Sequence, residues 1–147
     1  MHDVIIKINN TSSNAVPEYA TPGSSGMDLR ANLQEPVSLK PLERKLLPTG
    51  LFLEIPEGFE VQVRPRSGLA INHGLTCLNS PGTVDSDYRG EIKIILINLS
   101  NEEHIIQHGD RIAQMVVSKI EKAILQPSSE LNSSLRGQGG FGHTGKN

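Results

Sequence analysis

The stretch Glu-Ile-Lys-Ile-Ile-Leu-Ile-Asn at residues 91–98 contains the longest unbroken apolar run of the chain and indicates a β-strand. In an extended backbone, alternate side chains from Ile92 to Leu96 fall on one face, and Ile95 and Ile97 fall on the other. A strand that is apolar on both faces is central in its sheet or lies against another subunit.

Turn-forming residues recur on both sides of this strand at intervals of roughly 8–12 residues, which is typical of an all-β sandwich or barrel. Gly (14) and Pro (9) supply many of these turns, as at residues 56–58 and 109–110. Residues 59–64 (Phe-Glu-Val-Gln-Val-Arg) alternate apolar and polar side chains, as a half-buried strand does. The sequence therefore predicts an all-β fold.

The segment 111–125 fits two periodicities. Its apolar residues, among them Ile112 and Met115, could form the stripe of an amphipathic helix. The β-branched pair Val116 and Val117, and the turn that precedes the segment, favour a strand instead.

The size and charge of the chain limit what it can do. Its 147 residues and 16.0 kDa fit one compact domain, and 38 Ile, Leu and Val residues against five aromatic ones predict an aliphatic core. A formal charge of −2 argues against a protein that coats nucleic acid or an anionic membrane through bulk charge. Neither nucleic acid nor membrane is therefore expected as a partner.

Cys77 is the only cysteine, which excludes an intrachain disulfide and a zinc cluster built from cysteines of one chain. We interpret it as a small buried apolar residue rather than a reactive thiol. No apolar run approaches the roughly 20 residues of a spanning helix, and the first residues show no signal-peptide pattern. A cytoplasmic protein is expected.

The chain changes character after residue 126. We expect residues 1–126 to form the β core and residues 127–147 a flexible, Gly-rich C-terminal arm, because its glycines lose too much entropy on ordering to hold a fixed shape alone. Most such ends are simply disordered. This one carries two cations, among them Arg136, and the lone ring of Phe141, so it could wrap a phosphate and stack on a base.

Residues 65–69 (Pro-Arg-Ser-Gly-Leu) open the one helix that we predict, from Ser67 to about His73, which Gly74 can end. Ser67 is a suitable N-cap. The N–H groups of the first turn, together with Arg66, could bind an anion. An ordinary capped helix with a surface arginine is the alternative.

Residues 79–90 (Asn-Ser-Pro-Gly-Thr-Val-Asp-Ser-Asp-Tyr-Arg-Gly) are too polar for a simple hairpin. Asp85 and Asp87 are two residues apart and are expected on one side of extended chain, where one could act as a general base on water. Tyr88 offers a flat face for a sugar or a base. A turn that needs Asp and Gly for its geometry is the alternative explanation.

Other polar residues are weaker indicators when taken singly. Asp28 follows a glycine turn, and Arg111 opens a strand next to a turn. The five histidines form no metal-binding pair beside a glutamate; His104 and His108 are expected to point the same way in a strand and to be solvated. The chain lacks the phosphate-loop, nucleophile-elbow and dinucleotide-binding patterns.

Taken together and in order, five segments resemble the five motifs of the trimeric dUTP diphosphatases (dUTPases). They are Gly-Met-Asp-Leu at 26–29, Pro-Arg-Ser-Gly at 65–68, Gly-Thr-Val-Asp-Ser-Asp-Tyr-Arg-Gly at 82–90, Gly-Asp-Arg-Ile-Ala-Gln at 109–114 and Arg-Gly-Gln-Gly-Gly-Phe-Gly-His-Thr-Gly at 136–145. Ser25 and His143 stand where many members have Ala and Ser. Each motif is weak alone, but five in this order are highly specific.

The resemblance implies a jelly-roll-like β-barrel with one short helix, and a homotrimer whose three sites each draw on all three chains. It implies hydrolysis of dUTP to dUMP and pyrophosphate by in-line attack of water on the α-phosphorus. This reaction supplies dUMP for thymidylate synthesis and keeps uracil out of DNA. Mg²⁺ would be held by the triphosphate and waters rather than by protein side chains, and the arm would close over the active site.

Carried over by position, Asp85 resembles the base that activates the attacking water, and Tyr88 the residue packed under the deoxyribose. Asn79 and the backbone of the hairpin that it begins resemble the part of the site that recognises uracil. Phe141 resembles the ring that closes over uracil. The phosphate binders implied are Arg66, Ser67, Gly68, Gln114, Arg136, His143 and Thr144. Further substrate-binding positions are Gly82, Thr83, Val84, Lys93 and Gly142, while Asp28 and Arg111 resemble residues that link the motifs across subunits.

Two other functions stay open at this point. A dCTP deaminase shares this fold and several motifs, but its catalytic glutamate falls here on Ile95, which cannot move protons. Glu91 is four positions away from that place, and the tail motif resembles that of the diphosphatases. Zinc-dependent deaminases need cysteines that the chain lacks. A non-catalytic trimer that senses nucleotides or docks a partner is the third possibility, and the intact Asp85 with its phosphate-binding motifs argues against it.

Overall fold

The computed structural model describes residues 3–145, in which ten strands and one helix follow one another along the chain. His2 and residues 146–147, the last two of the expected arm, lie outside this range. The elements are β1 (Lys7–Asn10), β2 (Met27–Arg30), β3 (Val37–Leu39), β4 (Arg44–Glu54), β5 (Phe59–Arg64), α1 (Ser67–His73), β6 (Leu75–Cys77), β7 (Gly82–Val84), β8 (Glu91–Asn98), β9 (His104–Ile106) and β10 (Arg111–Lys119).

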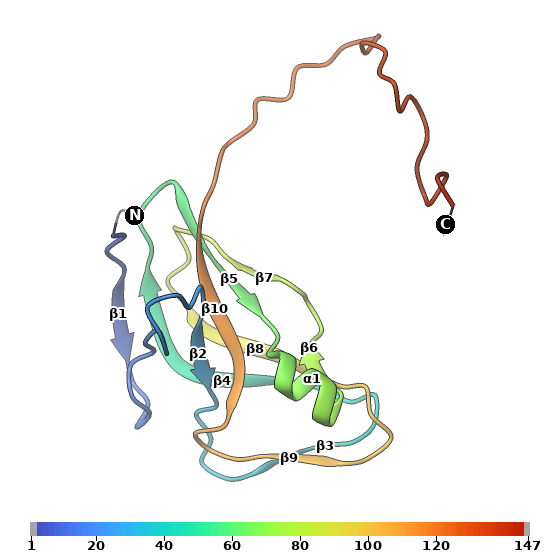
Figure 1. Ribbon diagram of the computed structural model, residues 1–147. Helices are drawn as coiled ribbons and strands as arrows, with labels where there is room; N and C mark the ends of the chain where they lie inside the picture. The colour runs from blue at the N-terminus through green and yellow to red at the C-terminus, as the bar shows by residue number, and fades with distance from the viewer. Residues whose placement is uncertain (1–2, 146–147) are drawn as a thin grey trace.

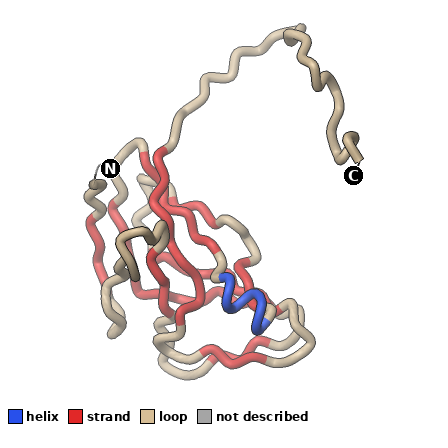
Figure 2. The backbone as a smooth tube through the Cα atoms, viewed as in Figure 1, coloured by secondary structure: helices blue, strands red, loops and turns tan. Residues whose placement is uncertain are grey.

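The strands form two four-stranded sheets and a small two-stranded one (Figures 1 and 2). The first sheet has the order β1-β4-β8-β6, the second β2-β10-β5-β7, and β3 pairs with β9. Every pairing is antiparallel. The all-β prediction is confirmed, and so is the central place of residues 91–98, because β8 lies between β4 and β6.

The core between the sheets is aliphatic, as the composition predicted. Leu29 and Val61 come from the second sheet and Ile94 and Leu96 from the first, and all four are at most 1% exposed. Burying one such side chain contributes about 1.5–3 kcal/mol. Cys77 is also buried, and this burial raises the pKa of its thiol to about 11. Its interpretation as a packed apolar residue is confirmed.

The segment 111–125 is a strand only in its first part. β10 ends at Lys119, and the N–H of Ile120 donates to the carbonyl of Gly58 at 2.9 Å. Beyond this bond the chain is neither strand nor helix, and Ile124 is 96% exposed. From here the chain runs away from the sheets as a long extended arm (Figure 1).

The short helix lies where it was predicted, but its N-cap is one residue earlier. Arg66 occupies the N-cap with extended φ and ψ of −96° and 130°, and its side chain makes no capping hydrogen bond. Ser67 is the first helical residue, because the first helical bond runs from the N–H of Ala70 to the carbonyl of Arg66. Gly74 ends the helix in the left-handed region at φ 63°.

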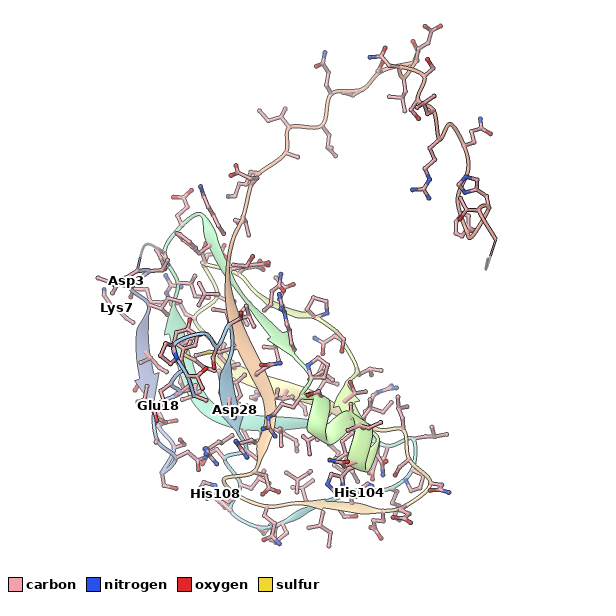
Figure 3. All side chains as sticks on the ribbon, in the orientation of Figure 1. Asp3, Lys7, Glu18, Asp28, His104 and His108 are labelled. Atoms are coloured by element: carbon pink, nitrogen blue, oxygen red, sulfur yellow. The ribbon has the colours of Figure 1, made fainter. Side chains whose placement is uncertain are left out.

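The two histidines of the segment 104–108 do not share a strand, contrary to expectation. β9 ends at Ile106, and His108 lies in the following turn (Figure 3). There its Nδ1 accepts the N–H of Leu33 at 3.1 Å and its Nε2 lies 2.8 Å from Oγ of Ser13. Its ring therefore ties together two loops. Within the described residues, no helix combines the length and the apolar character needed to cross a membrane.

Candidate active site

A cavity of about 280 Å³ opens where the chain crosses from one sheet to the other. β7 pairs with β5 in the second sheet, whereas β8 pairs with β4 and β6 in the first. The segment that Asn79 begins is therefore a crossing between sheets and not the hairpin that was expected. The residues predicted for substrate that line this cavity are Asn79, Gly82, Thr83, Val84, Asp85, Tyr88 and Lys93.

The remaining lining of the cavity is mostly apolar. Val63, Ile92 and Ile94 are buried, and Ile95 and Leu46 also line the cavity. A mainly apolar pocket with a few polar groups at one side is the usual form of a small-molecule site.

Asp85 lies at the end of β7, exposed to solvent, on the wall of this cavity. Its carbonyl accepts the N–H of Tyr88 at 3.1 Å, so residues 85–88 form a turn. Asp87 is not among the residues that line the cavity, but Asp85 and Asp87 both line a neighbouring groove, together with Arg89. The expectation of extended chain at these residues is wrong, because β7 ends at Val84 and a turn follows, although both carboxylates face one common groove.

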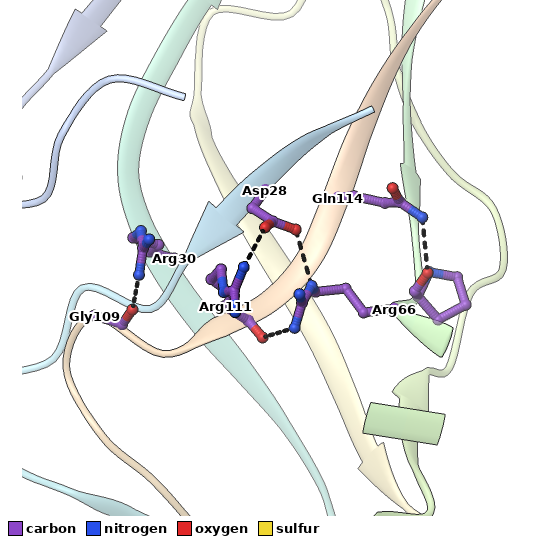
Figure 4. A network of polar contacts seen from close by, with 7 residues as sticks. Asp28, Arg30, Arg66, Gly109, Arg111 and Gln114 are labelled. Atoms are coloured by element: carbon purple, nitrogen blue, oxygen red, sulfur yellow. Dashed lines mark hydrogen bonds and ion pairs between the residues drawn. The ribbon is translucent and has the colours of Figure 1, made fainter. Parts of the chain in front are cut away.

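A second group of predicted residues surrounds Asp28 on β2 (Figure 4). Its Oδ1 lies 2.8 Å from Nε of Arg66, and its Oδ2 lies 3.2 Å from Arg111 at the start of β10. Arg66 also donates to the carbonyl of Arg111 at 3.4 Å. The Asp28 side chain is 31% exposed, and ion pairs at such partly exposed positions contribute about 1 kcal/mol or less. The main effect of this group is to fix the two guanidinium groups.

Gln114 lies on β10 between two strands, with Asp28 opposite on β2 and Arg64 opposite on β5. Its Nε2 donates to the carbonyl of Pro65 at 3.3 Å, which places its amide beside the start of α1. Gly26 leaves room for this side chain, because a Cβ there would lie 2.5 Å from Oε1 of Gln114. Ser67 and Gly68 are exposed on the first turn of α1.

The arm is separate from both groups. Among the described residues, no hydrogen bond joins residues 123–145 to the sheets, and the bonds of this segment are local turns. Nε of Arg136 donates to the carbonyl of Gly139 at 2.7 Å, and the ring of Phe141 is fully exposed. Gly142, His143 and Thr144 are exposed as well. A single chain therefore does not bring the arm to the cavity.

Sequence reasoning gave Glu91 no role in the site, but this residue contributes to the cavity wall. Its Oε1 accepts the N–H of Gly50 at 2.9 Å, its Oε2 lies 3.8 Å from Nζ of Lys93, and its carbonyl accepts the hydroxyl of Tyr88 at 2.9 Å. The sequence offers no signal for this role beyond the place of Glu91 directly after the motif 82–90. In the part of the chain that the structure describes, no three His, Cys, Asp or Glu side chains gather into a possible metal site.

The comparison with known protein families agrees with this arrangement. The sequence profile of the dUTPase family matches residues 12–145, which is nearly the whole chain. The chain belongs to the dUTPase family. A deoxyuridine 5′-triphosphate nucleotidohydrolase of Fusobacterium nucleatum is 57% identical over 99% of this chain and 100% of its own length. One of Cytophaga hutchinsonii is 58% identical over 96% of this chain and 92% of its own length.

Solved dUTPase structures share the fold. The dUTPase of Staphylococcus bacteriophage 80alpha with dUPNHPP superimposes with a TM-score of 0.82 at 27% identity, over 96% of this chain and 98% of that one. A dUTPase from phage phi11 of S. aureus, whose structure concerns the coordination of a structural Mg(II) ion, has a TM-score of 0.76 at 24% identity, over 86% and 97% of the two chains. The jelly-roll-like dUTPase fold is thus confirmed for this chain.

Proposed function

We propose that this dUTPase hydrolyses dUTP to dUMP and pyrophosphate. One observation carries the proposal: Asp85, Tyr88, Asn79 and the strand Gly82–Val84 line the same cavity. One bound nucleoside could therefore contact the Asp85 carboxylate, the flat ring of Tyr88 and the backbone polar groups of β7. The names of the close relatives given above support the same substrate.

Uracil would bind against Asn79 and the backbone of β7. A slot built from backbone excludes the methyl group of thymine by shape, and cytosine by mismatched donors and acceptors, which leaves buried polar groups unpaired. Tyr88 would pack under the deoxyribose, where a 2′-hydroxyl would collide with it.

The triphosphate would bind to the second group of residues. Arg66 and the amide of Gln114 offer donors, and the N–H groups of Ser67 and Gly68 lie uncapped on the first turn of α1. Asp28 and Arg111 hold the Arg66 guanidinium from the other side. Such fixed donors stabilise the charge that develops on pyrophosphate as it leaves.

Asp85 would act as the general base. Its carboxylate is exposed at the cavity wall, so a water molecule can reach it. It takes a proton from this water while the oxygen forms a bond to the α-phosphorus, and the bond from that phosphorus to the bridging oxygen breaks in line. The electron pair of the broken bond leaves with pyrophosphate.

The donor set fits Mg²⁺ held by the substrate. The side chains at the proposed phosphate site, Arg66 and Gln114, donate hydrogen bonds to phosphate oxygens, and a cationic arginine does not ligate a metal. Mg²⁺ bound to the triphosphate supplies charge neutralisation of the phosphate oxygens.

A homotrimer would complete the site. The cavity, the group around Asp28 and the arm are separate in one chain, so a second and a third copy can supply what the first lacks. The arm residues Arg136, Phe141, Gly142, His143 and Thr144 would then close over substrate in a neighbouring subunit and exclude bulk water. We place residues 1–126 in the β-barrel core and residues 127–147 in this arm, and we expect the enzyme in the cytoplasm, where it would supply dUMP for thymidylate synthesis.

The rival deaminase reaction is disfavoured by Ile95. This residue lies on the cavity wall, at the position that would carry the deaminase glutamate, and its side chain can hold no proton. Incubation with dUTP, dTTP, UTP and dCTP, measuring both pyrophosphate and ammonia, tests the proposal. We expect pyrophosphate from dUTP alone. Ammonia from dCTP would support a deaminase, and tight dUTP binding without turnover would support a non-catalytic nucleotide sensor.

A further inference from the structure

Gly90, the last residue of the motif 82–90, has been given no role above, and it lies against the hydroxyl end of the Tyr88 ring. We propose that Gly90 and Glu91 form a seat for Tyr88 that fixes its ring in the cavity wall and so sets the discrimination between deoxyribose and ribose. This inference rests on the proposed function, in which Tyr88 packs against the sugar.

The backbone at Gly90 does not require glycine. Its φ lies outside the left-handed region, which glycine alone occupies freely. The reason for glycine is space: a Cβ at this position would lie 2.5 Å from Cζ and 2.9 Å from Cε2 of Tyr88, and closer still to its hydroxyl oxygen. Any other residue at position 90 would collide with the ring where it now lies.

Glu91 binds the same end of the ring through a hydrogen bond. The hydroxyl of Tyr88 donates to the carbonyl of Glu91 at 2.9 Å. The carboxylate of Glu91 in turn accepts the N–H of Gly50 at 2.9 Å, at the irregularity that interrupts the pairing of β4 with β8. The Glu91 side chain is only 22% exposed. The ring is thus tied through Glu91 to the central strands of the first sheet.

The seat explains how a half-exposed tyrosine can select a sugar. Tyr88 is 45% exposed, and a free aromatic ring at such a position changes rotamer readily. The contact with Gly90 and the hydrogen bond to Glu91 restrict the Tyr88 ring to a single orientation. A 2′-hydroxyl is rejected only if the ring cannot move aside, so the rejection depends on the seat as much as on the ring.

The substitution Gly90→Ala tests the seat, because the added Cβ would collide with the Tyr88 side chain, which can move, and not with the backbone. The ring can rotate away, so the protein should fold while Tyr88 is displaced. We expect the ratio of kcat/KM for dUTP to that for UTP to fall by about tenfold or more, within the range that one methyl group can decide. Gly23→Ala is the matched control, since a Cβ there meets no atom within 4 Å, and it should leave the ratio unchanged.

A double-mutant cycle separates the seat from a general effect. In a Tyr88→Ala background there is no ring to displace, so Gly90→Ala should no longer change the ratio. If Gly90→Ala lowers the ratio equally in both backgrounds, it does not act through Tyr88 and the seat is refuted. If Tyr88→Ala alone leaves the ratio at its original value, the sugar role assigned to Tyr88 under the proposed function is wrong.

Fluorescence reports the ring without any activity. The chain has two tyrosines and no tryptophan, so Tyr19→Phe leaves Tyr88 as the only tyrosine. In this background Gly90→Ala should increase the quenching of tyrosine emission by iodide, and Glu91→Ala should do the same by removing the link to Gly50. Unchanged quenching in both variants would overturn the seat, whatever the outcome with nucleotides. Should Gly90→Ala fail to fold, Glu91→Ala alone gives the same test of both quenching and sugar ratio.

Discussion

Nε of Arg66 lies 2.8 Å from Oδ1 of Asp28, although 38 positions separate the two residues in the chain (Figure 4). The carboxylate comes from β2 and the guanidinium from the N-cap of α1, so one ion pair joins the second sheet to the start of the helix. Arg111 shares the same carboxylate. Three motifs that are distant in sequence are held in one place by a single acidic side chain.

The substitution Asp28→Asn should weaken catalysis more than folding. The amide keeps the size of the side chain but not the charge that orients Arg66, and misplacement of a substrate-positioning group is costly. We expect kcat/KM for dUTP to fall by about tenfold or more, and the free energy of unfolding to change by about 1 kcal/mol or less. Steady-state kinetics and urea unfolding measure the two effects, with Glu18→Gln, at an exposed position, as the control. A large loss of stability with unchanged kinetics would mean that the ion pair serves the fold alone.

Cys77 should make stability depend on pH above 9. Burial raises its pKa to about 11 from the ordinary value of 9.0, so between these values the unfolded chain loses a proton that the folded chain keeps. The free energy of unfolding attributable to Cys77 is therefore constant below pH 9 and falls as the pH rises towards 11. Urea unfolding at pH 8 and pH 10 should show a smaller decline for Cys77→Val than for the natural chain. Equal declines would contradict the burial of this thiol.

Truncation before Arg136 should leave a folded trimer with little activity. The strands end at Lys119, and the removed residues make no hydrogen bond with the sheets within the described part of the chain. Thermal unfolding and size-exclusion chromatography should therefore match those of the full chain, while pyrophosphate release is nearly lost. Dissociation of the trimer on truncation would show that the arm serves assembly.

The substitution Asp85→Asn should lower kcat by about 10²–10⁴, the usual cost of losing a general base. The affinity for dUTP should stay within a few fold, because the amide occupies the same space at the cavity wall. Binding is measured by calorimetry with a non-hydrolysable dUTP analogue and turnover by pyrophosphate release. Asp87→Asn is the matched control, because Asp87 does not line the cavity, and this variant should leave kcat nearly unchanged. Unchanged turnover in Asp85→Asn would remove this residue from the mechanism.

Much of the fold can be predicted from local sequence patterns. The strand Glu91–Asn98 has the bounds that its two-sided apolar pattern indicated, because side-chain alternation depends only on neighbouring residues. The helix and its end at Gly74 follow from equally local signals. The strand pairing does not: β7 joins β5 and not its neighbours in sequence, and this depends on how two sheets close over one core.

The site was predicted as residue types and not as a geometry. The motifs identified Asp85 and Tyr88, yet the turn at residues 85–88, after which Asp85 lines the cavity and Asp87 does not, depends on where β7 ends. The role of Glu91 was missed because it arises from contact with Gly50, which is distant in sequence. Gly26 and Gly90 are glycine because of side chains that approach them, Gln114 and Tyr88, and such approaches are visible only in three dimensions.

The position of the broken bond tests the central claim most directly. Hydrolysis of dUTP with Mg²⁺ in water enriched in ¹⁸O, followed by mass spectrometry of both products, identifies the phosphorus that water attacks. Attack at the α-phosphorus predicts that ¹⁸O enters dUMP and that the released pyrophosphate carries none. Label in pyrophosphate, or dUTP that stays intact with the assembled enzyme, would contradict the account.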